Sequence, residues 1–241
     1  MSRTVLVTGG GSGLGRAIAA RFVQDSDRVY ITGRRTEVLE RTARELGGDA
    51  HALPCDGIDP DAVESAVARI DGEVDVLVNN AGGNTDFREP AGGGLKGSLH
   101  RWRANIDANL ITAALMTEAC DDKLASGGAV VHIGSVGADQ GSGAYGSAKA
   151  ALASYSVGLS KQLGPRDITS NVVAPGYIPD TEFFGSGVSQ ERHDHLISLT
   201  ALGRHGFPDE IAGAVHFLAS ADARFITGQV INPNGGARTT R

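Results

Sequence analysis

A tyrosine and a lysine four residues apart, Tyr145 and Lys149, are the side chains whose spacing best suits proton transfer. On a helix, residues four apart share one face, with Cβ atoms roughly 5–6 Å apart. We expect the Lys149 ammonium to favour the ionised phenol and to lower its pKa from about 10. A phenol tuned in this way can exchange a proton with a substrate oxygen near neutral pH. Taken alone, the same spacing also fits a half-buried tyrosine beside a solvated lysine.

The residues around this pair predict how it is held. An apolar strand at 129–133 leads through a Gly-Ser turn, ending near Ser142, into a long helix whose first turn carries Tyr145. The apolar stripe of that helix consists of Ala148, Leu152, Tyr155 and Leu159. Ser135 follows the strand directly, so we expect it beside the tyrosine as a second hydrogen-bonding group.

A second region suited to chemistry lies at the start of the chain. An apolar strand at 4–8 precedes a turn with glycine at positions 9, 11, 13 and 15, and a helix at 16–23 follows. Strand, glycine loop and helix form a phosphate-binding arrangement, because the backbone can approach the anion and helix N–H groups face it. A flexible turn without a ligand is the alternative, which the strand-to-helix context disfavours.

The residues after the second predicted strand, at 28–32, indicate which dinucleotide binds. Arg34 lies about 20 residues past the glycine loop, where an acid would hold the ribose hydroxyl of NAD and an arginine accommodates the 2′-phosphate of NADP. NADP(H) is therefore expected in preference to NAD(H). The alternative is that Arg34 and Arg35 are solvated residues that open the helix at 36–46.

Strands and helices alternate through the first half of the chain. Strands at 51–55 and 74–78 are separated by a helix at 60–70, for which Asp59 is the expected N-cap. Such repeats predict an α/β fold in which a doubly wound parallel sheet binds ligands at the carboxyl ends of its strands. The polar residues expected at those ends, along one crevice, are Thr8, Arg34, Asp56 and Asn79.

The region after the fourth strand is expected to be irregular before a long helix begins. Positions 83–97 are rich in glycine, with Phe87 and Pro90 among them, and predict a loop over the crevice. A helix at 99–124 follows and presents Asn109. Asparagine inside a helix is often only solvated or bonded to the preceding turn.

The last third of the chain predicts two more strands and a cover for the site. We expect strands at 168–174 and 228–233, with a helix at 208–219 between them. The segment 179–205 is predicted to be a mobile substrate lid. His193 and His195 within it are two residues apart, a poor spacing for a helical metal site, so no metal is expected.

The bulk composition limits the fold, the partners and the compartment. With 241 residues, 41% of them hydrophobic, the chain fits one large domain at 1–241. A net charge of −6 argues against nucleic acid or an anionic membrane as the main partner. The N-terminus lacks a signal-peptide pattern, and no apolar run approaches the roughly 18–20 residues of a membrane span. Cys55 and Cys120 are expected to be reduced, buried thiols of a cytoplasmic protein.

Six motifs follow one another along the chain at compatible spacings. They are Thr8-Gly9-x-x-x-Gly13-x-Gly15, Asn79-Asn80-Ala81-Gly82, Ser135, Tyr145-x-x-x-Lys149, Pro175-Gly176, and Thr227-Gly228-Gln229 with Gly235-Gly236. Together they resemble the classical branch of the short-chain dehydrogenase/reductase family over essentially the whole chain. The resemblance implies a Rossmann-type sheet of about seven parallel strands, a nicotinamide cofactor, and a homotetramer or homodimer assembled partly through the Tyr145 helix.

The resemblance also implies a role for each site residue. Tyr145 would be the general acid in reduction, and Lys149 would hold the nicotinamide ribose while lowering the tyrosine pKa. Ser135 would polarise the substrate carbonyl, and Asn109 would support a proton-relay water. The cofactor contacts would come from Thr8, Gly9, Gly11, Ser12, Gly13, Leu14, Gly15, Arg34, Arg35, Asp56, Gly57, Asn80, Ala81, Gly82, Tyr145, Lys149, Pro175, Gly176, Ile178 and Thr181.

Two departures from the family pattern affect these expectations. Tyr145 follows Ser135 by ten residues, and many members have about two or three more there, so the loop at 137–143 should be tight. Ser12 occupies the second basic NADP position of the family, so the NADP(H) prediction depends mainly on Arg34.

The combined prediction is an NADPH-dependent oxidoreductase that reduces a ketone to a secondary alcohol. A polyketide or other secondary-metabolite ketone is the favoured substrate. The alternative is a 3-oxoacyl thioester on an acyl carrier protein, for which the candidate basic contacts are Arg101, Arg103, Arg192 and Arg204. A non-catalytic NADP-binding sensor on the same fold is the alternative of a different class.

Overall fold

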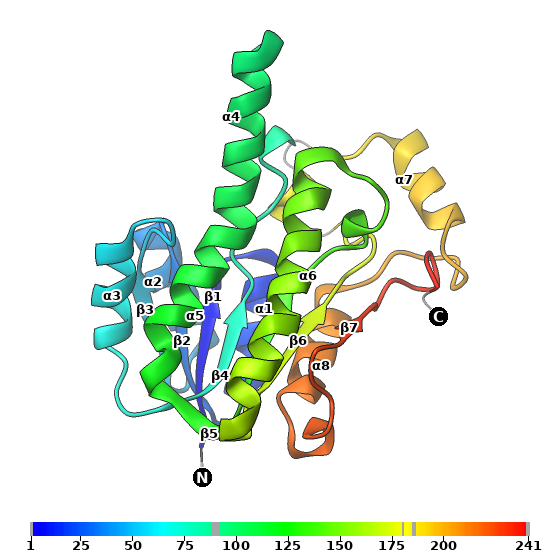
Figure 1. Cartoon of the computed structure of the whole chain (residues 1–241). Coiled ribbons are helices and arrows are strands. Elements are labelled where there is room, and N and C mark those ends of the chain that lie inside the picture. Colours follow the sequence, from blue (N-terminus) through cyan, green and yellow to red (C-terminus); the bar gives the residue numbers. More distant parts are fainter. Residues whose placement is uncertain (1, 88–91, 180, 185–186, 240–241) are drawn as a thin grey trace.

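The architecture is built on one parallel sheet. The computed structural model describes residues 2–87, 92–179, 181–184 and 187–239. Seven parallel strands lie in the order β3-β2-β1-β4-β5-β6-β7 (Figure 1). Their bounds are β1 (Thr4–Thr8), β2 (Arg28–Gly33), β3 (Ala50–Pro54), β4 (Val74–Asn79), β5 (Leu124–Ile133), β6 (Thr169–Val173) and β7 (Val230–Ile231). The predicted single-domain, doubly wound α/β fold is confirmed.

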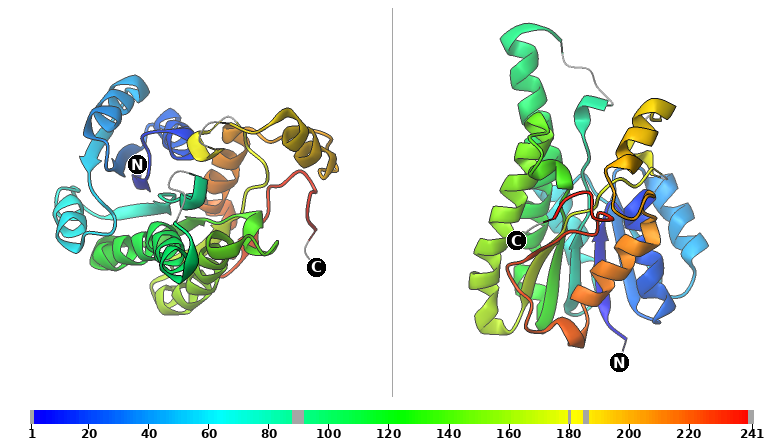
Figure 2. Two further views of the ribbon diagram at one scale, coloured as in Figure 1. Left: turned by 90° about the horizontal axis from the view of Figure 1, so that it is seen from above. Right: turned by 90° about the vertical axis from the view of Figure 1, so that its right-hand side faces the viewer.

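Alternation along the strands distributes the apolar side chains between two layers. In β1, Val5 and Val7 face one layer and Leu6 faces the other, because successive strand side chains point to opposite faces. Figure 2 shows helices on both sides of the sheet. One layer contains α1 (Gly13–Gln24), α2 (Thr36–Leu46) and α8 (Pro208–Leu218), and the other contains α3 (Pro60–Ala68), α5 (Thr112–Cys120) and α6 (Gly143–Leu163).

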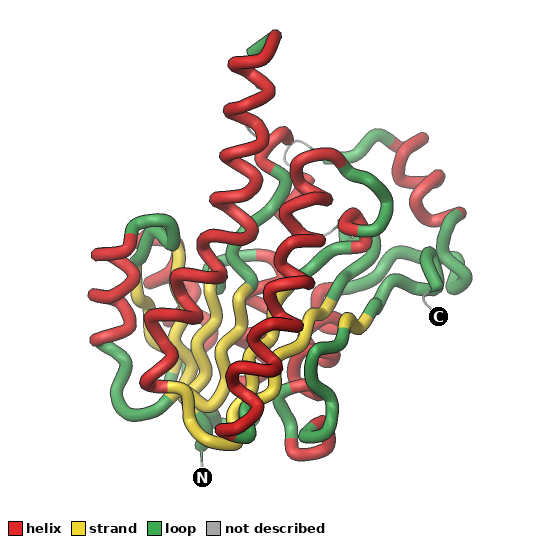
Figure 3. Tube along the Cα trace, in the orientation of Figure 1, coloured by secondary structure: helices red, strands yellow, loops and turns green. Residues whose placement is uncertain are grey.

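Two further helices extend beyond these layers. The amino-terminal part of α4 (Gly94–Ile106) projects past the rest of the molecule, and α7 (Gln190–Ser198) stands apart beside the carboxyl ends of the strands (Figure 3). The predicted lid segment therefore contains a regular helix, and its function as a lid stays a prediction. Among the described residues, no helix is long and apolar enough to cross a membrane.

The helix predicted at 99–124 begins earlier and is interrupted. α4 starts at Gly94, inside the segment predicted to be irregular, because three glycines at 92–94 hide the apolar periodicity that marks a helix start. A π-helical turn at Asp107–Ile111 separates α4 from α5. Pro90, which the prediction placed in the same loop, lies outside the described residues.

Several predicted boundaries differ from the structure. β5 begins at Leu124, so the predicted helix end at 124 and strand start at 129 are wrong. Small residues at 125–128 gave no strand signal there, because β propensity depends on branched and aromatic side chains. The last strand, predicted at 228–233, has only two residues. Asp59 caps α3 as predicted, and its carboxylate accepts from two backbone N–H groups at 3.1 and 3.3 Å.

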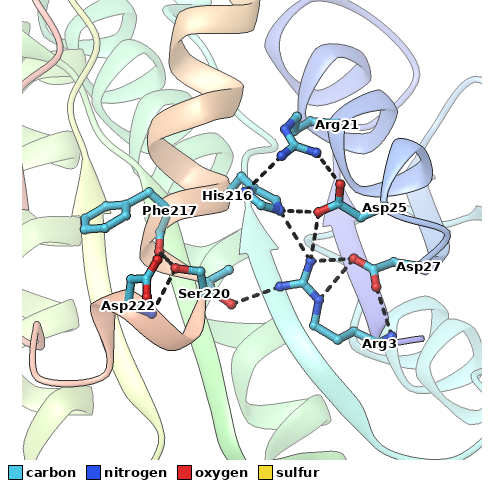
Figure 4. A network of polar contacts seen from close by, with 9 residues as sticks. Arg3, Arg21, Asp25, Asp27, His216, Phe217, Ser220 and Asp222 are labelled. Carbon is cyan, nitrogen blue, oxygen red and sulfur yellow. Dashed lines mark hydrogen bonds and ion pairs between the residues drawn. The ribbon is translucent and has the colours of Figure 1, made fainter. Parts of the chain in front are cut away.

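A cluster of ion pairs lies at the amino end of β1 (Figure 4). The Arg3 guanidinium donates to the buried Asp27 carboxylate at 2.6 and 3.1 Å, and to the Ala219 carbonyl at 3.1 Å. His216, on α8, lies 2.6 Å from the carboxylate of Asp25. Because an unpaired buried carboxylate is costly, Asp27 depends on this pairing. The cluster joins the start of β1 to the ends of α1 and α8.

Candidate active site

The turns after β1 and β4 are fastened together at the point where the strand order reverses. The Thr8 hydroxyl accepts from the backbone N–H groups of Asn80 and Ala81, each at 2.9 Å. The Asn80 amide donates to the carbonyls of Thr8 at 2.9 Å and Gly9 at 3.2 Å. Doubly wound sheets bind their ligands at this reversal. Thr8 and Asn80 therefore shape the expected cofactor site, and their direct contact with a cofactor stays a prediction.

Tyr145, Lys149 and Ser135 are brought together by β5 and α6. Tyr145 and Lys149 are both buried in the first turns of α6, and the Ser135 side chain lies close enough to influence the pKa of Tyr145. The Lys149 ammonium donates at 2.7 Å to the carbonyl of Ile133, the last residue of β5. Ser135 also accepts from the Gly137 N–H at 3.0 Å, which fixes the turn after β5. The residues predicted to do the chemistry form one group.

The acidity of Tyr145 differs from the sequence-based expectation. Burial raises the pKa of Tyr145 to about 12, and the nearby Ser135 side chain opposes this shift. Burial also lowers the pKa of Lys149 to about 8. The prediction that Lys149 makes the phenol acidic is therefore wrong for this state of the protein, because desolvation disfavours the charged form of both groups. At neutral pH the phenol keeps its proton and remains a hydrogen-bond donor.

The loop between Ser135 and Tyr145 is short and closed by its own hydrogen bonds. A 3-10 turn at Val136–Ala138 follows Ser135, and the Ser142 N–H donates to the Gly137 carbonyl at 3.4 Å. The loop at 137–143 is tight, as predicted from its length.

Asn109 holds the turn after β4 in place. It lies in the π-helical turn, is buried, and exchanges two hydrogen bonds of 2.9 Å with the Gly83 backbone. A Cβ at Gly82 would lie 2.5 Å from the Asn109 Oδ1 atom, so only glycine allows the turn to approach this closely. π-Helical turns within helices frequently occur at functional sites. A part for Asn109 in a proton relay stays a prediction.

The glycine loop presents backbone donors suited to a phosphate. Ser12, the N-cap of α1, is extended and makes no side-chain cap hydrogen bond, and the first turn contains no acidic residue. The first N–H groups of α1 therefore lack intrahelical partners, and the positive end of the helix dipole favours an anion. A Cβ at Gly15 would lie 2.2 Å from the Gly9 carbonyl oxygen, which requires glycine where α1 packs on the loop. This donor set fits a pyrophosphate.

Arg35 reaches the glycine loop. Its guanidinium donates to the Ser12 hydroxyl at 3.3 Å, and both Arg34 and Arg35 are exposed. A planar guanidinium beside this loop suits the 2′-phosphate of NADP, because its donors match phosphate oxygens in pairs. Asp56 and Gly57 follow β3 on the same edge of the sheet. Their contact with the adenine stays a prediction.

The segment after β6 extends from the catalytic group to the glycine loop. Pro175 and Gly176 are tied by backbone hydrogen bonds of 3.2 Å to the turn after β5 and to the C-terminal segment. Ile178 is buried. Thr181 lies over Gly13, where an added Cβ would be 3.5 Å from the Thr181 Cβ. The position of this segment fits contacts with both the nicotinamide and the phosphates.

Asn79 does not line the cofactor site. Its amide donates to the Thr117 hydroxyl at 2.8 Å and lies 3.3 Å from Nδ1 of His132, in a buried polar cluster within the second helix layer. Burial, and then the nearby charge of Lys149, lower the pKa of His132 to about 3. Asn79 was predicted to face the crevice, and this is wrong because it is the last residue of β4 and points to the α5 side. The one sequence signal for the cluster was a histidine within an apolar strand.

Two phenylalanines for which no site role was predicted lie at the catalytic group. The rings of Phe183 and Tyr145 have centroids 5.6 Å apart, and Tyr145 is 6% exposed. Phe87, after β4, meets Phe183 edge-on at 5.7 Å. The available sequence signal was a pair of adjacent phenylalanines in a polar, turn-rich segment.

Comparison with known proteins agrees with this arrangement. Residues 9–238 match a family model described as enoyl-(acyl carrier protein) reductase. The chain belongs to the short-chain dehydrogenase/reductase family. This oxidoreductase is 34% identical over 242 residues to 3-oxoacyl-(acyl-carrier-protein) reductase FabG of Escherichia coli (strain K12), covering 97% of this chain and 96% of the relative.

Two further relatives have names that describe different properties. The chain is 38% identical over 238 residues to a cyclic-di-GMP-binding biofilm dispersal mediator protein of Escherichia coli (strain K12), covering 97% of this chain and 96% of that protein. A blue fluorescent protein from a metagenomic library, crystallised with NADPH, superposes with a TM-score of 0.87 at 32% identity over 98% of each chain. The predicted family and enzyme class are confirmed.

Proposed function

We propose that this short-chain dehydrogenase/reductase is an NADPH-dependent carbonyl reductase that converts a ketone into a secondary alcohol. The cofactor is NADP(H), as in the metagenomic relative, and the glycine loop with Arg35 fits its phosphates. When bound, NADPH supplies the hydride. The observation that carries the proposal is the grouping of the buried Tyr145 and Lys149 with Ser135, in which a protonated phenol lies near a hydroxyl.

Each side chain of this group has a separate task. Ser135 donates a hydrogen bond to the substrate oxygen and polarises the carbonyl. Tyr145 gives its proton to the same oxygen as negative charge develops there. Because burial raises the pKa of Tyr145 to about 12, the phenol is protonated at neutral pH, which suits reduction better than alcohol oxidation. Lys149 uses one of its three N–H donors on Ile133 and has the others for the cofactor ribose.

Replacement of the phenol tests this mechanism. Tyr145→Phe should lower the rate of ketone reduction by about 10²- to 10⁴-fold, the usual contribution of a general acid, and leave NADPH affinity unchanged. Tyr155→Phe, on the same helix, is the matched control and should keep the parental rate. NADPH oxidation measures turnover, and NADPH fluorescence measures binding. A Tyr145→Phe enzyme that reduces ketones at near the parental rate would contradict the mechanism.

We propose a polyketide-like or other free secondary-metabolite ketone as the substrate. Two arginines suggested for contact with an acyl carrier protein are engaged within the chain. Arg204 donates to the Glu210 carboxylate at 2.6 and 3.0 Å, and the Arg192 guanidinium lies 5.9 Å from the Phe87 ring centroid. The alternative is a carrier-bound 3-oxoacyl thioester, as the name of the FabG relative suggests.

A substrate panel separates these possibilities. NADPH and NADH oxidation should be compared on 3-oxoacyl thioesters, 2-enoyl thioesters, simple ketones and polycyclic aromatic ketones. Free ketones should be reduced with higher kcat/KM than the thioesters. Preference for a carrier-bound 3-oxoacyl thioester would move the assignment to fatty-acid-type reduction, and preference for the enoyl thioester would contradict carbonyl reduction.

The biofilm relative suggests a sensor as a second candidate of a different class. A non-catalytic protein of this fold would bind NADP(H) or a cyclic dinucleotide and respond by changing its contacts. The complete group of Tyr145, Lys149 and Ser135 favours the enzyme. Calorimetric titration with cyclic di-GMP, beside the ketone assay, tests the sensor. Tight nucleotide binding without turnover on any ketone would favour it.

We propose that the protein assembles as a homotetramer, or a homodimer, partly through the Tyr145 helix α6 and also through the projecting helix α4. Leu95, Leu99 and Trp102 share one face of α4 and are 90%, 51% and 41% exposed. An exposed apolar helix face of this kind fits contact with a second copy. Trp102→Glu should reduce the mass measured by light scattering, and an unchanged mass would contradict this interface.

We also propose a cytoplasmic location. Cys55 and Cys120 are both buried and free of disulfide bonds, as is usual for proteins of reducing compartments. Expression of a tagged chain followed by fractionation tests this location.

A further inference from the structure

Aromatic residues gather over the proposed active site, although they make up only 5% of the chain. The Phe183 ring lies 5.6 Å from Tyr145, 5.7 Å from Phe87 and 4.8 Å from Phe184, measured between centroids. Tyr177 continues the cluster at 5.5 Å from Phe184. The Phe183–Phe87, Phe183–Phe184 and Tyr177–Phe184 pairs are edge-to-face, at 87°, 84° and 70°, an arrangement that aromatic pairs favour.

The cluster blocks the approach to the phenol. Phe183 packs on the Tyr145 ring, and Tyr145 is only 6% exposed. A substrate carbonyl that accepts the phenol proton has to come within about 3 Å of the hydroxyl. The Phe183 side chain must therefore move aside when the substrate enters. The neighbours that Phe183 leaves, Tyr145, Phe87 and Phe184, are all aromatic rings.

Tyr177 and Phe87, two other rings of the cluster, make contacts that do not involve Phe183. The Tyr177 hydroxyl lies 2.8 Å from Nδ1 of His193 on α7. The Arg192 guanidinium, one residue earlier on α7, lies 5.9 Å from the centroid of Phe87. Because these contacts do not involve Phe183, the remaining rings stay in place to receive an incoming group.

We infer that Phe87 and Phe184 select a ketone whose carbonyl is attached to an aromatic ring. An aryl group entering beside Tyr145 replaces the ring contacts that Phe183 gives up, whereas an aliphatic group of the same size fills the space without the edge-to-face attraction. The inference rests on the proposed carbonyl reduction and adds the class of substrate. Phe87 and Phe184 are then specificity-determining residues that touch the substrate.

A matched pair of ketones tests this selection. Acetophenone and cyclohexyl methyl ketone differ in the aromaticity of the ring beside the carbonyl. Their kcat/KM ratio should be measured for the parent enzyme, for Phe87→Leu and for Phe184→Leu. Each substitution should shift the ratio toward the cyclohexyl ketone by about 2- to 10-fold, the size of one ring–ring contact. Phe217→Leu, at a half-exposed ring on α8, is the control and should leave the ratio unchanged.

Comparison of variants with the parent removes the difference in intrinsic reactivity between the two ketones. A second measurement on the parent alone serves if a variant fails to fold. 1-Phenylethanol should inhibit ketone reduction at a concentration several-fold lower than 1-cyclohexylethanol. Ratios that stay unchanged in both variants, or equal inhibition by the two alcohols, would overturn the aromatic selection while ketone reduction stands. Absence of turnover with every ketone would overturn the proposed function and this inference together.

Discussion

The buried ammonium of Lys149 should make the cofactor-free protein less stable than it would be with an apolar residue there. Burial lowers the pKa of Lys149 from 10.5 to about 8. At 1.36 kcal/mol per unit, this shift corresponds to roughly 3 kcal/mol of unfavourable free energy while the lysine is protonated. Lys149→Met also removes the 2.7 Å hydrogen bond to the Ile133 carbonyl, which costs about 1 kcal/mol. The variant should therefore be about 2 kcal/mol more stable at pH 7, and inactive.

The pH dependence of this difference has a defined sign. The folded-state pKa of Lys149 lies below its unfolded value, so the unfolded chain binds more protons between about pH 8 and 10.5. The free energy of unfolding of the parent therefore rises with pH over this interval, and the methionine variant lacks this contribution. Between pH 7 and 9.5 the advantage of the variant should shrink by about 2 kcal/mol. Tyr145, which is present in both proteins, does not contribute to the difference.

Urea unfolding of the cofactor-free proteins at the two pH values measures these quantities. Lys161→Met is the matched control, because Lys161 is exposed near the end of the same helix. A Lys149→Met variant less stable than the parent at pH 7, or a stability difference that is the same at both pH values, would refute the reasoning.

Three further predictions concern the cofactor, the turn after β4 and the thiols. Arg35→Ala should raise the KM for NADPH about 10-fold and leave the KM for NADH unchanged, since a guanidinium binds phosphate in paired hydrogen bonds. The control Arg41→Ala should leave the KM for NADPH unchanged. Equal effects of Arg35→Ala on both cofactors would count against a 2′-phosphate site. Asn109→Ala should lower the free energy of unfolding by about 2 kcal/mol, because the Gly83 backbone loses buried partners. Urea midpoints test this loss, and an unchanged midpoint would contradict it. Burial raises the pKa of Cys120 to about 12, so this thiol should react with thiol reagents at pH 8 only after unfolding; rapid labelling of the native protein would contradict this.

The strand–helix alternation and the catalytic group could be predicted because each depends on local signals. Apolar runs ending in polar residues placed the first four strands within one residue of their bounds, and the four-residue spacing of Tyr145 and Lys149 placed both on one helix face. The elements that were missed lacked such signals. Glycine-rich residues begin α4, small residues begin β5, and the π-helical turn around Asn109 interrupts a continuous helical pattern.

The pKa values and side-chain orientations at the site were harder to predict than the residues that form it. The acidity of Tyr145 depends on burial of its phenol, and Phe183, from a distant part of the chain, packs on the Tyr145 ring. The orientation of Asn79 depends on Thr117 and His132, which come from α5 and β5. Desolvation and partner choice are tertiary properties, so the residue types alone indicated an acidified tyrosine and a crevice-lining asparagine.

Ion pairs join Arg3 to Asp27 and His216 to Asp25 at the amino ends of the strands. Tyr145 and the glycine loop lie at the carboxyl ends of the strands. Effects of mutations at well-separated positions usually add. Directed evolution could therefore strengthen these ion pairs to make the protein more tolerant of heat or solvent. It could independently change the aromatic rings around Tyr145 to alter the range of substrates. Because the ion pairs and the candidate site lie at opposite ends of the strands, thermal robustness and substrate range are separable traits of this oxidoreductase.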